Sequence, residues 1–120
     1  MNESNLELSR AEHALKNAKD LSKEKVNRLP GLIQGNGLLA TLAFVSEEKE
    51  ERKELKNAME AVIDYLRERE ILNSSLNKEN ENKILITINE LTNGDSLKLQ
   101  QATIESLKYL SYLKRFSKKS

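Results

Sequence analysis

The sequence has 120 residues, of which 38% are hydrophobic, 32% charged and only 4% aromatic, and its formal net charge is +1. This length suits one domain with an aliphatic core, and the absence of cysteine excludes disulfides and thiolate metal sites. The first ten residues lack the apolar core of a secretory signal, and the longest apolar run, residues 37–45, is too short to span a membrane. We therefore expect a cytoplasmic, all-α protein, a compact helical bundle of about five to six helices in a single domain over residues 1–120.

The first expected helix covers Leu6 to Val26. At about 100° per residue its apolar side chains fall on one side; they are Leu8, Ala11, Ala14, Leu15, Ala18, Leu21 and Val26. Lys16, Lys19 and Lys23 fall together on a flank, which is either a solvated helix face or a stripe that faces phosphate. His13, the single histidine, points away from the apolar stripe, and we expect it to be exposed and inert.

Leu29-Pro30 predicts a helix boundary, because proline suits the first turn of a helix and disfavours helix before it. Residues 30–45 are the most apolar part of the chain and are expected to form the buried central helix. The glycines at 31, 35 and 37 do not form a phosphate-binding loop, since no strand precedes them and no Gly-Lys-Ser/Thr follows. They indicate either the close approach of another helix or a kink at residues 35–37.

From Ser46 the chain becomes polar, and this serine with the acids after it predicts the start of a helix that runs to about Leu72. The acids of residues 47–54 alternate with lysine and arginine, which is typical of a salt-bridged solvent face rather than a metal site. Residues 73–82 are expected to form a polar loop.

Lys83 to Leu91 fits the period of a strand and that of a helix. We predict a helix, because an isolated strand would have no partner elsewhere in the sequence. Asn93-Gly94-Asp95 is then expected to end this helix and to begin the next.

The last expected helix runs from Ser96 to Lys118. Its broad apolar face consists of Leu99, Ala102, Tyr109, Leu110, Tyr112, Leu113 and Phe116. Ile104 lies on the opposite side and Leu107 on a flank, and a helix that is apolar on two sides is either covered by two layers or docks onto a partner. The best candidates for nucleic-acid contact stand near Ile104 and in the basic tail of residues 117–120; they are Lys108, Lys114, Arg115, Lys118 and Lys119, with Lys16, Lys19 and Lys23 as a second group.

The sequence contains no pattern that predicts catalysis. Without cysteine or a second histidine the chain cannot form the usual zinc ligand sets, and a Ser-His-Asp arrangement would have to use His13. No carboxylate pair is expected on an apolar wall that would shift its pKa. We expect no enzyme activity, no metal, no cofactor and no small-molecule substrate.

Three segments, taken together and in this order, carry a family resemblance. They are RAEHALKNAK from Arg10, LPGLIQGNGLLATLAF from Leu29, and ATIESLKYLSYLKRF from Ala102. With them the chain resembles the small helical subunit of the type III-B CRISPR effector, the Cmr complex or RAMP module. Two mild departures are Tyr112, where the family pattern leads us to expect tryptophan, and Ser117, where it leads us to expect alanine.

The resemblance implies a non-catalytic subunit in antiviral RNA interference. Several copies would stack along the backbone subunits that carry the CRISPR RNA and would help to hold the guide–target duplex, while cleavage and signalling belong to the backbone and large subunits. A stacking subunit needs two different apolar patches, and Ile104 and Leu107 are candidates for one of them. The alternatives are a generic helical adaptor without RNA contact, and a small regulatory enzyme that uses carboxylates and a divalent metal.

Overall fold

The structure is a computed structural model that describes residues 3–74 and 82–118. These residues form six α-helices and one short 3-10 helix: α1 (Glu3–Asn17), α2 (Lys23–Asn36), α3 (Leu38–Ser46), η1 (Glu50–Arg52), α4 (Lys53–Glu68), α5 (Lys83–Asn93) and α6 (Ser96–Phe116). Within the described ranges the one β-type pairing is an isolated parallel bridge between Ser22 and Lys118. The predicted all-α fold is confirmed.

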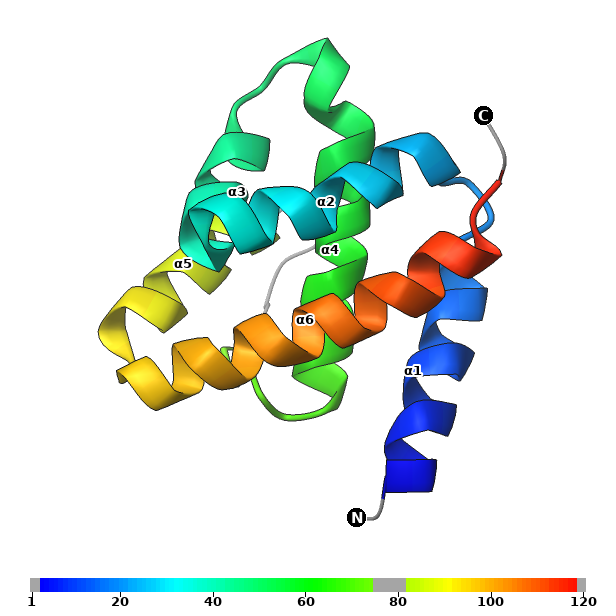
Figure 1. Cartoon of the computed structure of the whole chain (residues 1–120). Coiled ribbons are helices and arrows are strands. Elements are labelled where there is room, and N and C mark those ends of the chain that lie inside the picture. Colours follow the sequence, from blue (N-terminus) through cyan, green and yellow to red (C-terminus); the bar gives the residue numbers. More distant parts are fainter. Residues whose placement is uncertain (1–2, 75–81, 119–120) are drawn as a thin grey trace.

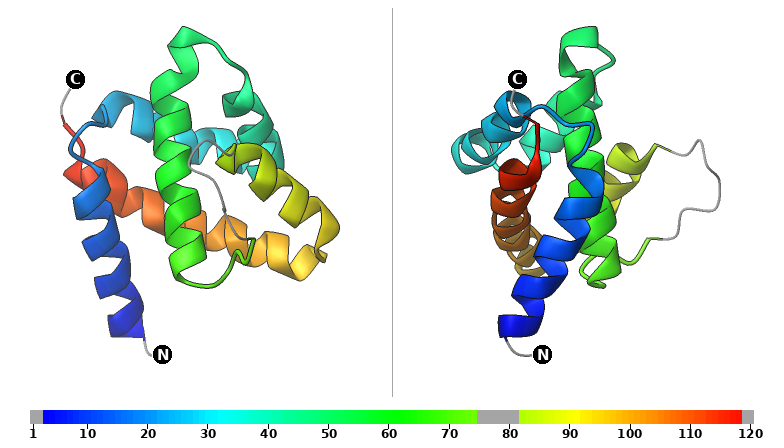
Figure 2. Two further views of the ribbon diagram at one scale, coloured as in Figure 1. Left: turned by 180° about the vertical axis from the view of Figure 1, so that it is seen from behind. Right: turned by 90° about the vertical axis from the view of Figure 1, so that its right-hand side faces the viewer.

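The bundle is organised around α4, which packs against each of the other five α-helices. α6 crosses one side of α4, with α1 and α2 packed along it, and α3 and α5 pack together at the other end (Figure 1). The view from behind shows α4 running across α6 (Figure 2). Half of α4 is buried, including Leu55, Met59, Ile63 and Leu66. The prediction that residues 30–45 form the buried central helix is therefore wrong.

The predicted helix over residues 6–26 is two helices, since α1 ends at Asn17 and α2 begins at Lys23. The Leu21 N–H donates to the Ala18 carbonyl in the turn between them, and the Ser22 hydroxyl caps α2 by accepting from the Lys25 N–H. The apolar periodicity continues through this turn because Ala18, Leu21 and Val26 are all buried. Periodicity alone therefore did not reveal the break.

The orientation of α1 also differs from the prediction. Leu8 is 67% exposed and Leu15 58% exposed, while Arg10 is buried in their place. At the end of α6, Phe116, which the sequence placed on the broad apolar face of this helix, is 39% exposed. The predicted boundary at Leu29-Pro30 is wrong as well, because Pro30 lies inside α2.

The helix is interrupted at Gly37, between α2 and α3, which agrees with the kink predicted at residues 35–37. This glycine has φ 92° and ψ 161°, a backbone conformation that is essentially restricted to glycine. Its N–H donates to the Ile33 carbonyl, and its own carbonyl accepts from the Thr41 N–H. A Cβ atom added at Gly31, Gly35 or Gly37 would meet nothing within 4 Å, so no helix of the described chain approaches closely there.

The remaining boundaries follow local capping. Ser46 ends α3 rather than beginning a helix, and α4 begins at Lys53 after η1. The predicted helix at residues 83–91 is confirmed as α5, which ends at Asn93 with Gly94 as its C-cap, and Asp95 caps α6 by accepting from the Lys98 N–H. Glu47 forms ion pairs with Lys49 and Arg52, as expected for a salt-bridged solvent face.

Of the predicted polar loop at 73–82, residues 75–81 lie outside the described part of the chain. Its first two residues are held by Glu90, whose carboxylate accepts from the N–H groups of Asn73 and Ser74. Among the described residues, no helix combines the length and apolar character that crossing a membrane requires.

Candidate nucleic-acid interface

The end of α6 is held against the turn between α1 and α2. Beyond Phe116 the chain becomes extended, and the Lys118 N–H donates to the Leu21 carbonyl at 3.0 Å. The Lys23 N–H in turn donates to the Lys118 carbonyl at 2.6 Å, which completes the parallel bridge. Figure 1 shows the end of α6 beside the start of α2.

This bridge gathers cations from two regions that are far apart in the sequence, residues 19–23 and residues 114–118. Lys19 lies in the turn between α1 and α2, and Lys23 is the first residue of α2. Lys114 and Arg115 belong to the last turn of α6, and Lys118 follows that helix. We name this group the basic corner; it consists of Lys19, Lys23, Lys114, Arg115 and Lys118. Four of the five are exposed and Lys23 is half-buried. Asp20 and Glu24 are the acids of the same turn.

The ammonium group of Lys23 lies at the C-terminal end of α6. Its Nζ donates to the Arg115 carbonyl at 3.4 Å. The last carbonyls of a helix carry partial negative charge, so a cation is favoured there. Lys23 therefore helps to hold the end of α6 against the start of α2, and it also adds positive charge to the basic corner.

The other candidate residues are not part of this corner. Lys16 is exposed in the last turn of α1, and Lys108 is exposed about 10 Å along α6 from Arg115. Lys16, Lys19 and Lys23 were predicted to share one helix flank, but the break after α1 separates them. Lys119 lies outside the described residues. Ile104 is 48% exposed, whereas Leu107 is partly buried against the core.

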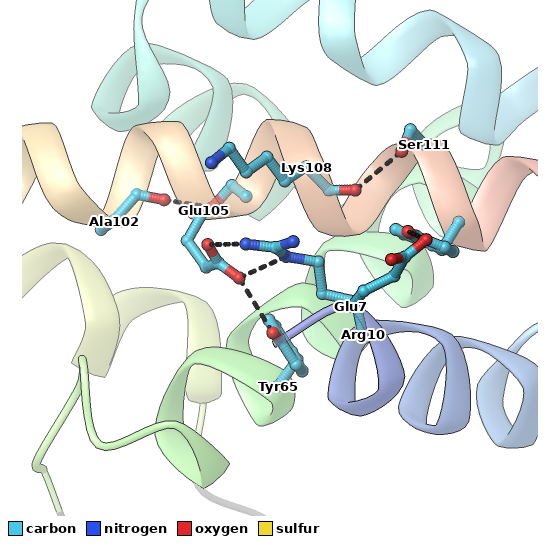
Figure 3. Close-up of polar contacts among 9 residues, drawn as sticks. Glu7, Arg10, Tyr65, Ala102, Glu105, Lys108 and Ser111 are labelled. Atoms are coloured by element: carbon cyan, nitrogen blue, oxygen red, sulfur yellow. Dashed lines mark hydrogen bonds and ion pairs between the residues drawn. The ribbon is translucent and has the colours of Figure 1, made fainter. Parts of the chain in front are cut away.

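A buried polar network lies beneath the middle of α6. The Arg10 guanidinium donates to both oxygens of Glu105, at 2.7 and 3.0 Å, and the Tyr65 hydroxyl donates to the same carboxylate at 2.9 Å (Figure 3). Arg10 is 5% exposed and Glu105 9% exposed. These contacts join α1, α4 and α6.

No pattern in the sequence predicted this network, in which a single carboxylate, Glu105, is buried with an arginine and a tyrosine. Burial opposes ionisation of this carboxyl, but the hydrogen bonds from Arg10 and Tyr65 outweigh it and lower its pKa. The pKa of Arg10 is raised mainly by the hydrogen bond to Glu105. The signal available in the sequence was the position of Glu105 between the buried positions Ala102 and Tyr109, at helical spacing.

His13 is a second part of the core that was predicted wrongly. Its side chain is 13% exposed rather than free in solvent, and it packs edge-on against the rings of Tyr65 and Tyr109. Nδ1 lies 2.6 Å from the Tyr109 hydroxyl and Nε2 lies 3.6 Å from a carboxylate oxygen of Glu68. With the proton of the neutral ring placed on Nε2, facing Glu68, Nδ1 accepts the hydrogen bond from Tyr109. Burial lowers the pKa of His13, although Glu68 and Asp64 act in the opposite direction.

The basic corner is a charged surface feature of the described residues. Over residues 3–74 and 82–118, no three histidine, cysteine, aspartate or glutamate side chains are placed to hold a metal ion. The basic corner offers positive charge on an exposed rim, which suits the phosphate backbone of a nucleic acid.

The model of one protein family, CRISPR-associated protein (Cas_Cmr5), matches residues 6–119. The chain belongs to the Cas_Cmr5 family. Cas_Cmr5 proteins are the small subunit of the type III-B CRISPR effector complex, so this chain is a subunit that assembles with other Cmr subunits. No curated protein and no solved structure matches it significantly.

The segments that carry the Cas_Cmr5 resemblance have clear structural roles. Arg10 belongs to the buried network, and the segment from Leu29 to Phe44 forms most of α2 and α3, including the break at Gly37. Tyr112 and Ser117, the two residues that depart from the expected family pattern, each donate a hydrogen bond. The Tyr112 hydroxyl donates to Glu7 at 3.1 Å, and the Ser117 hydroxyl donates to the Leu113 carbonyl at the end of α6.

Proposed function

We propose that this chain is a non-catalytic subunit that stacks in several copies along the guide–target RNA and presents the basic corner to the RNA backbone. The observation that carries the proposal is the bridge between residues 22 and 118, which joins cations of the α1–α2 turn to those of α6. A subunit of this kind needs charge rather than base-reading groups, because the guide supplies sequence specificity by base pairing.

Several features of the basic corner support contact with phosphate. Lys114, Arg115 and Lys118 are exposed, and none of them forms an ion pair with another described residue. Their backbone is fixed by helix α6 and by the bridge, so the cations are presented on an ordered rim. Lys108 lies further along the exposed side of α6 and extends the same surface. Lys16 extends it from α1, and we assign Lys119 to it by its place in the sequence.

The first test neutralises two cations of this corner without reversing their charge. In the assembled, guide-loaded Cmr complex, Arg115→Gln with Lys118→Gln is expected to weaken binding of complementary target RNA. Because each lost phosphate contact removes about one released counterion, the slope of log affinity against log salt should fall by about two for each incorporated copy that touches RNA. The measurement is a filter-binding titration at several salt concentrations.

The matched control is Lys53→Gln with Lys56→Gln, at the start of α4 and away from the basic corner. This variant carries the same change in net charge and is expected to keep the wild-type salt slope. An unchanged slope for the corner variant, with normal incorporation, would leave the generic adaptor without RNA contact as the better description.

In this proposal the chain itself performs no chemistry. Its single imidazole, His13, is mostly buried, contacts the Tyr109 hydroxyl and lies beside Glu68. Cleavage of the target then belongs to other subunits of the complex. The exposed Ile104 is assigned to contact between neighbouring copies, with Leu107 as a partly buried support behind it.

A further inference from the structure

Helix α1 has an apolar outer side that no described part of the chain covers. Leu8 is 67% exposed and Leu15 is 58% exposed, and their spacing of seven residues places them on one side of the helix about 10 Å apart. Glu12 lies between them and forms no ion pair or hydrogen bond with any described residue. We name Leu8, Glu12 and Leu15 the α1 ridge. Two large exposed leucines on one stripe are typical of a surface that meets a partner.

A groove of complementary character lies between α1, the end of α4 and α6. It has a volume of ≈ 330 Å³ and is lined by Leu6, Arg69, Ile71, Gln101, Ile104 and Glu105, which we name the α6 groove. Its aliphatic walls are Leu6, Ile71 and the half-exposed Ile104. This volume is at the lower end of the range for ligand sites, which suits one or two side chains of a protein partner.

The charge of the α6 groove comes from Arg69. The carboxylate of Glu105 at its edge is already compensated by Arg10, whereas the guanidinium of Arg69 forms no salt bridge with any residue in the described ranges. Arg69 and Ile71 flank Glu70, a non-glycine residue at φ 62° that turns the chain at the end of α4. Such left-handed residues are costly and cluster at functional surfaces. The groove thus combines apolar walls with one unpaired cation.

The α1 ridge and the α6 groove face different directions. Leu6, which lines the groove, and Leu8, on the ridge, are two residues apart and therefore about 200° apart around α1. The two surfaces accordingly lie on nearly opposite sides of this helix. A contact between two different surfaces of this kind is heterologous, and it repeats from copy to copy instead of closing into a two-fold dimer.

We propose that the α1 ridge of one copy docks into the α6 groove of the next copy. A ridge leucine packs against Ile71 and Ile104, and the Glu12 carboxylate pairs with the Arg69 guanidinium. This inference rests on the proposed stacking function and names both sides of the contact. The groove holds only one or two side chains, so we expect each contact to be weak and to gain strength when several copies share one RNA.

The test is a charge exchange in the full-length chain. Glu12→Arg alone places two cations in the contact, and Arg69→Glu alone places two anions there. Each single variant is expected to self-associate about tenfold more weakly than the wild type in sedimentation-velocity experiments. An equimolar mixture of the two variants restores opposite charges at every contact and is expected to recover wild-type association. The control, Glu51→Arg on the exposed η1 helix, should leave association unchanged.

The same variants are then added to the guide-loaded Cmr complex, and copies per complex are counted by native mass spectrometry. The wild type and the mixture should give the same copy number, and each single variant fewer copies. Single variants that match the wild type, or a mixture that fails to recover, overturn the groove assignment while leaving the family role intact. A wild-type chain that does not enter the complex overturns the proposed function, and the sedimentation result still decides the ridge–groove contact.

A photo-crosslinker at Ile104 identifies the occupant of the α6 groove in the assembled complex. The expected product joins Ile104 to α1 of a second copy. A product with RNA or with a different Cmr subunit would show that the groove has another occupant, and would overturn the proposal.

Discussion

Arg10 and Glu105 show how one buried pair decides the orientation of a helix. Their two hydrogen bonds, with the third from Tyr65, hold the polar side of α1 against α6 and α4. A buried charge that loses its partner is strongly destabilising, because the remaining charge has been taken out of water. The outward position of Leu8 and Leu15 follows from this preference.

The pair can be tested by comparing single and double replacements. Arg10→Met alone is expected to lower the free energy of unfolding by about 3 kcal/mol, since it leaves the Glu105 carboxylate without its cation. Arg10→Met combined with Glu105→Leu should be less destabilising than Arg10→Met, because no buried charge remains unpaired. Urea denaturation measures both. Glu105→Leu alone is measured as well, and a double variant that loses the sum of the two single effects would contradict this coupling.

His13 predicts a dependence of stability on mildly acidic pH. Burial lowers its pKa in the folded chain below the ordinary value of 6.5, so the unfolded chain binds the proton more readily. The contribution of neutral His13 to the stability of the folded chain is therefore fully present above pH 6.5. It is lost as the pH falls through the pKa of His13 in the folded chain. In urea denaturation at about pH 5 to 7.5, the wild type should lose stability toward the acid end, and His13→Gln should show a flatter profile. Equal slopes for the two chains would contradict the assignment.

Among the elements, the sequence predicted those whose signals are local. Asn82 and Asp95 cap α5 and α6 with their own side chains, and Gly94 ends α5, as short-range rules require. The rules failed where distant contacts decide the outcome. Pro30 sits inside α2 because burial of Val26, Leu29 and Ile33 around it outweighs the hydrogen bond that proline lacks.

The candidate site was predictable only in part for the same reason. The lysines and arginine at the end of α6 were visible as a basic stretch, but their union with Lys19 and Lys23 depends on the bridge between residues 22 and 118. No periodicity encodes a contact over that separation. The buried side of α1 could not be predicted from the sequence for the same reason. An arginine is normally a surface residue, and only the contact with Glu105 explains why Arg10 is buried.

The break at Gly37 gives a prediction at the level of α2 and α3. Gly37→Ala forces a side chain into a backbone conformation that nearly excludes it, and should lower the free energy of unfolding by about 1 to 3 kcal/mol. Gly31→Ala is the control, since Gly31 lies in α2 with open space around its Cα, and it should stabilise the chain by about 0.5 to 1 kcal/mol. Thermal and urea denaturation distinguish the two. Equal effects would contradict a special role for Gly37.

At the scale of the whole molecule, α6 carries both proposed surfaces on different halves. The basic corner uses the end of the helix and the α6 groove uses residues 101–105. Neutralising Arg115 and Lys118 should therefore leave self-association unchanged, and the Arg69→Glu variant should keep a folded basic corner. Loss of RNA contact and loss of stacking are thus expected to be separable by mutation.

The long reach of the Arg10–Glu105 pair also bears on how the chain folds during its synthesis. The two residues are 95 positions apart, and His13 and Tyr109 are 96 apart. α1 is therefore made first, but Arg10 meets Glu105, and His13 meets the Tyr109 hydroxyl, only when the last helix has been translated. The contacts of His13 with Tyr65 and Glu68 need only α4, which is made earlier. The packing of α6 against α1 thus joins the first and the last helices of the polypeptide, and it can form only after both have been made.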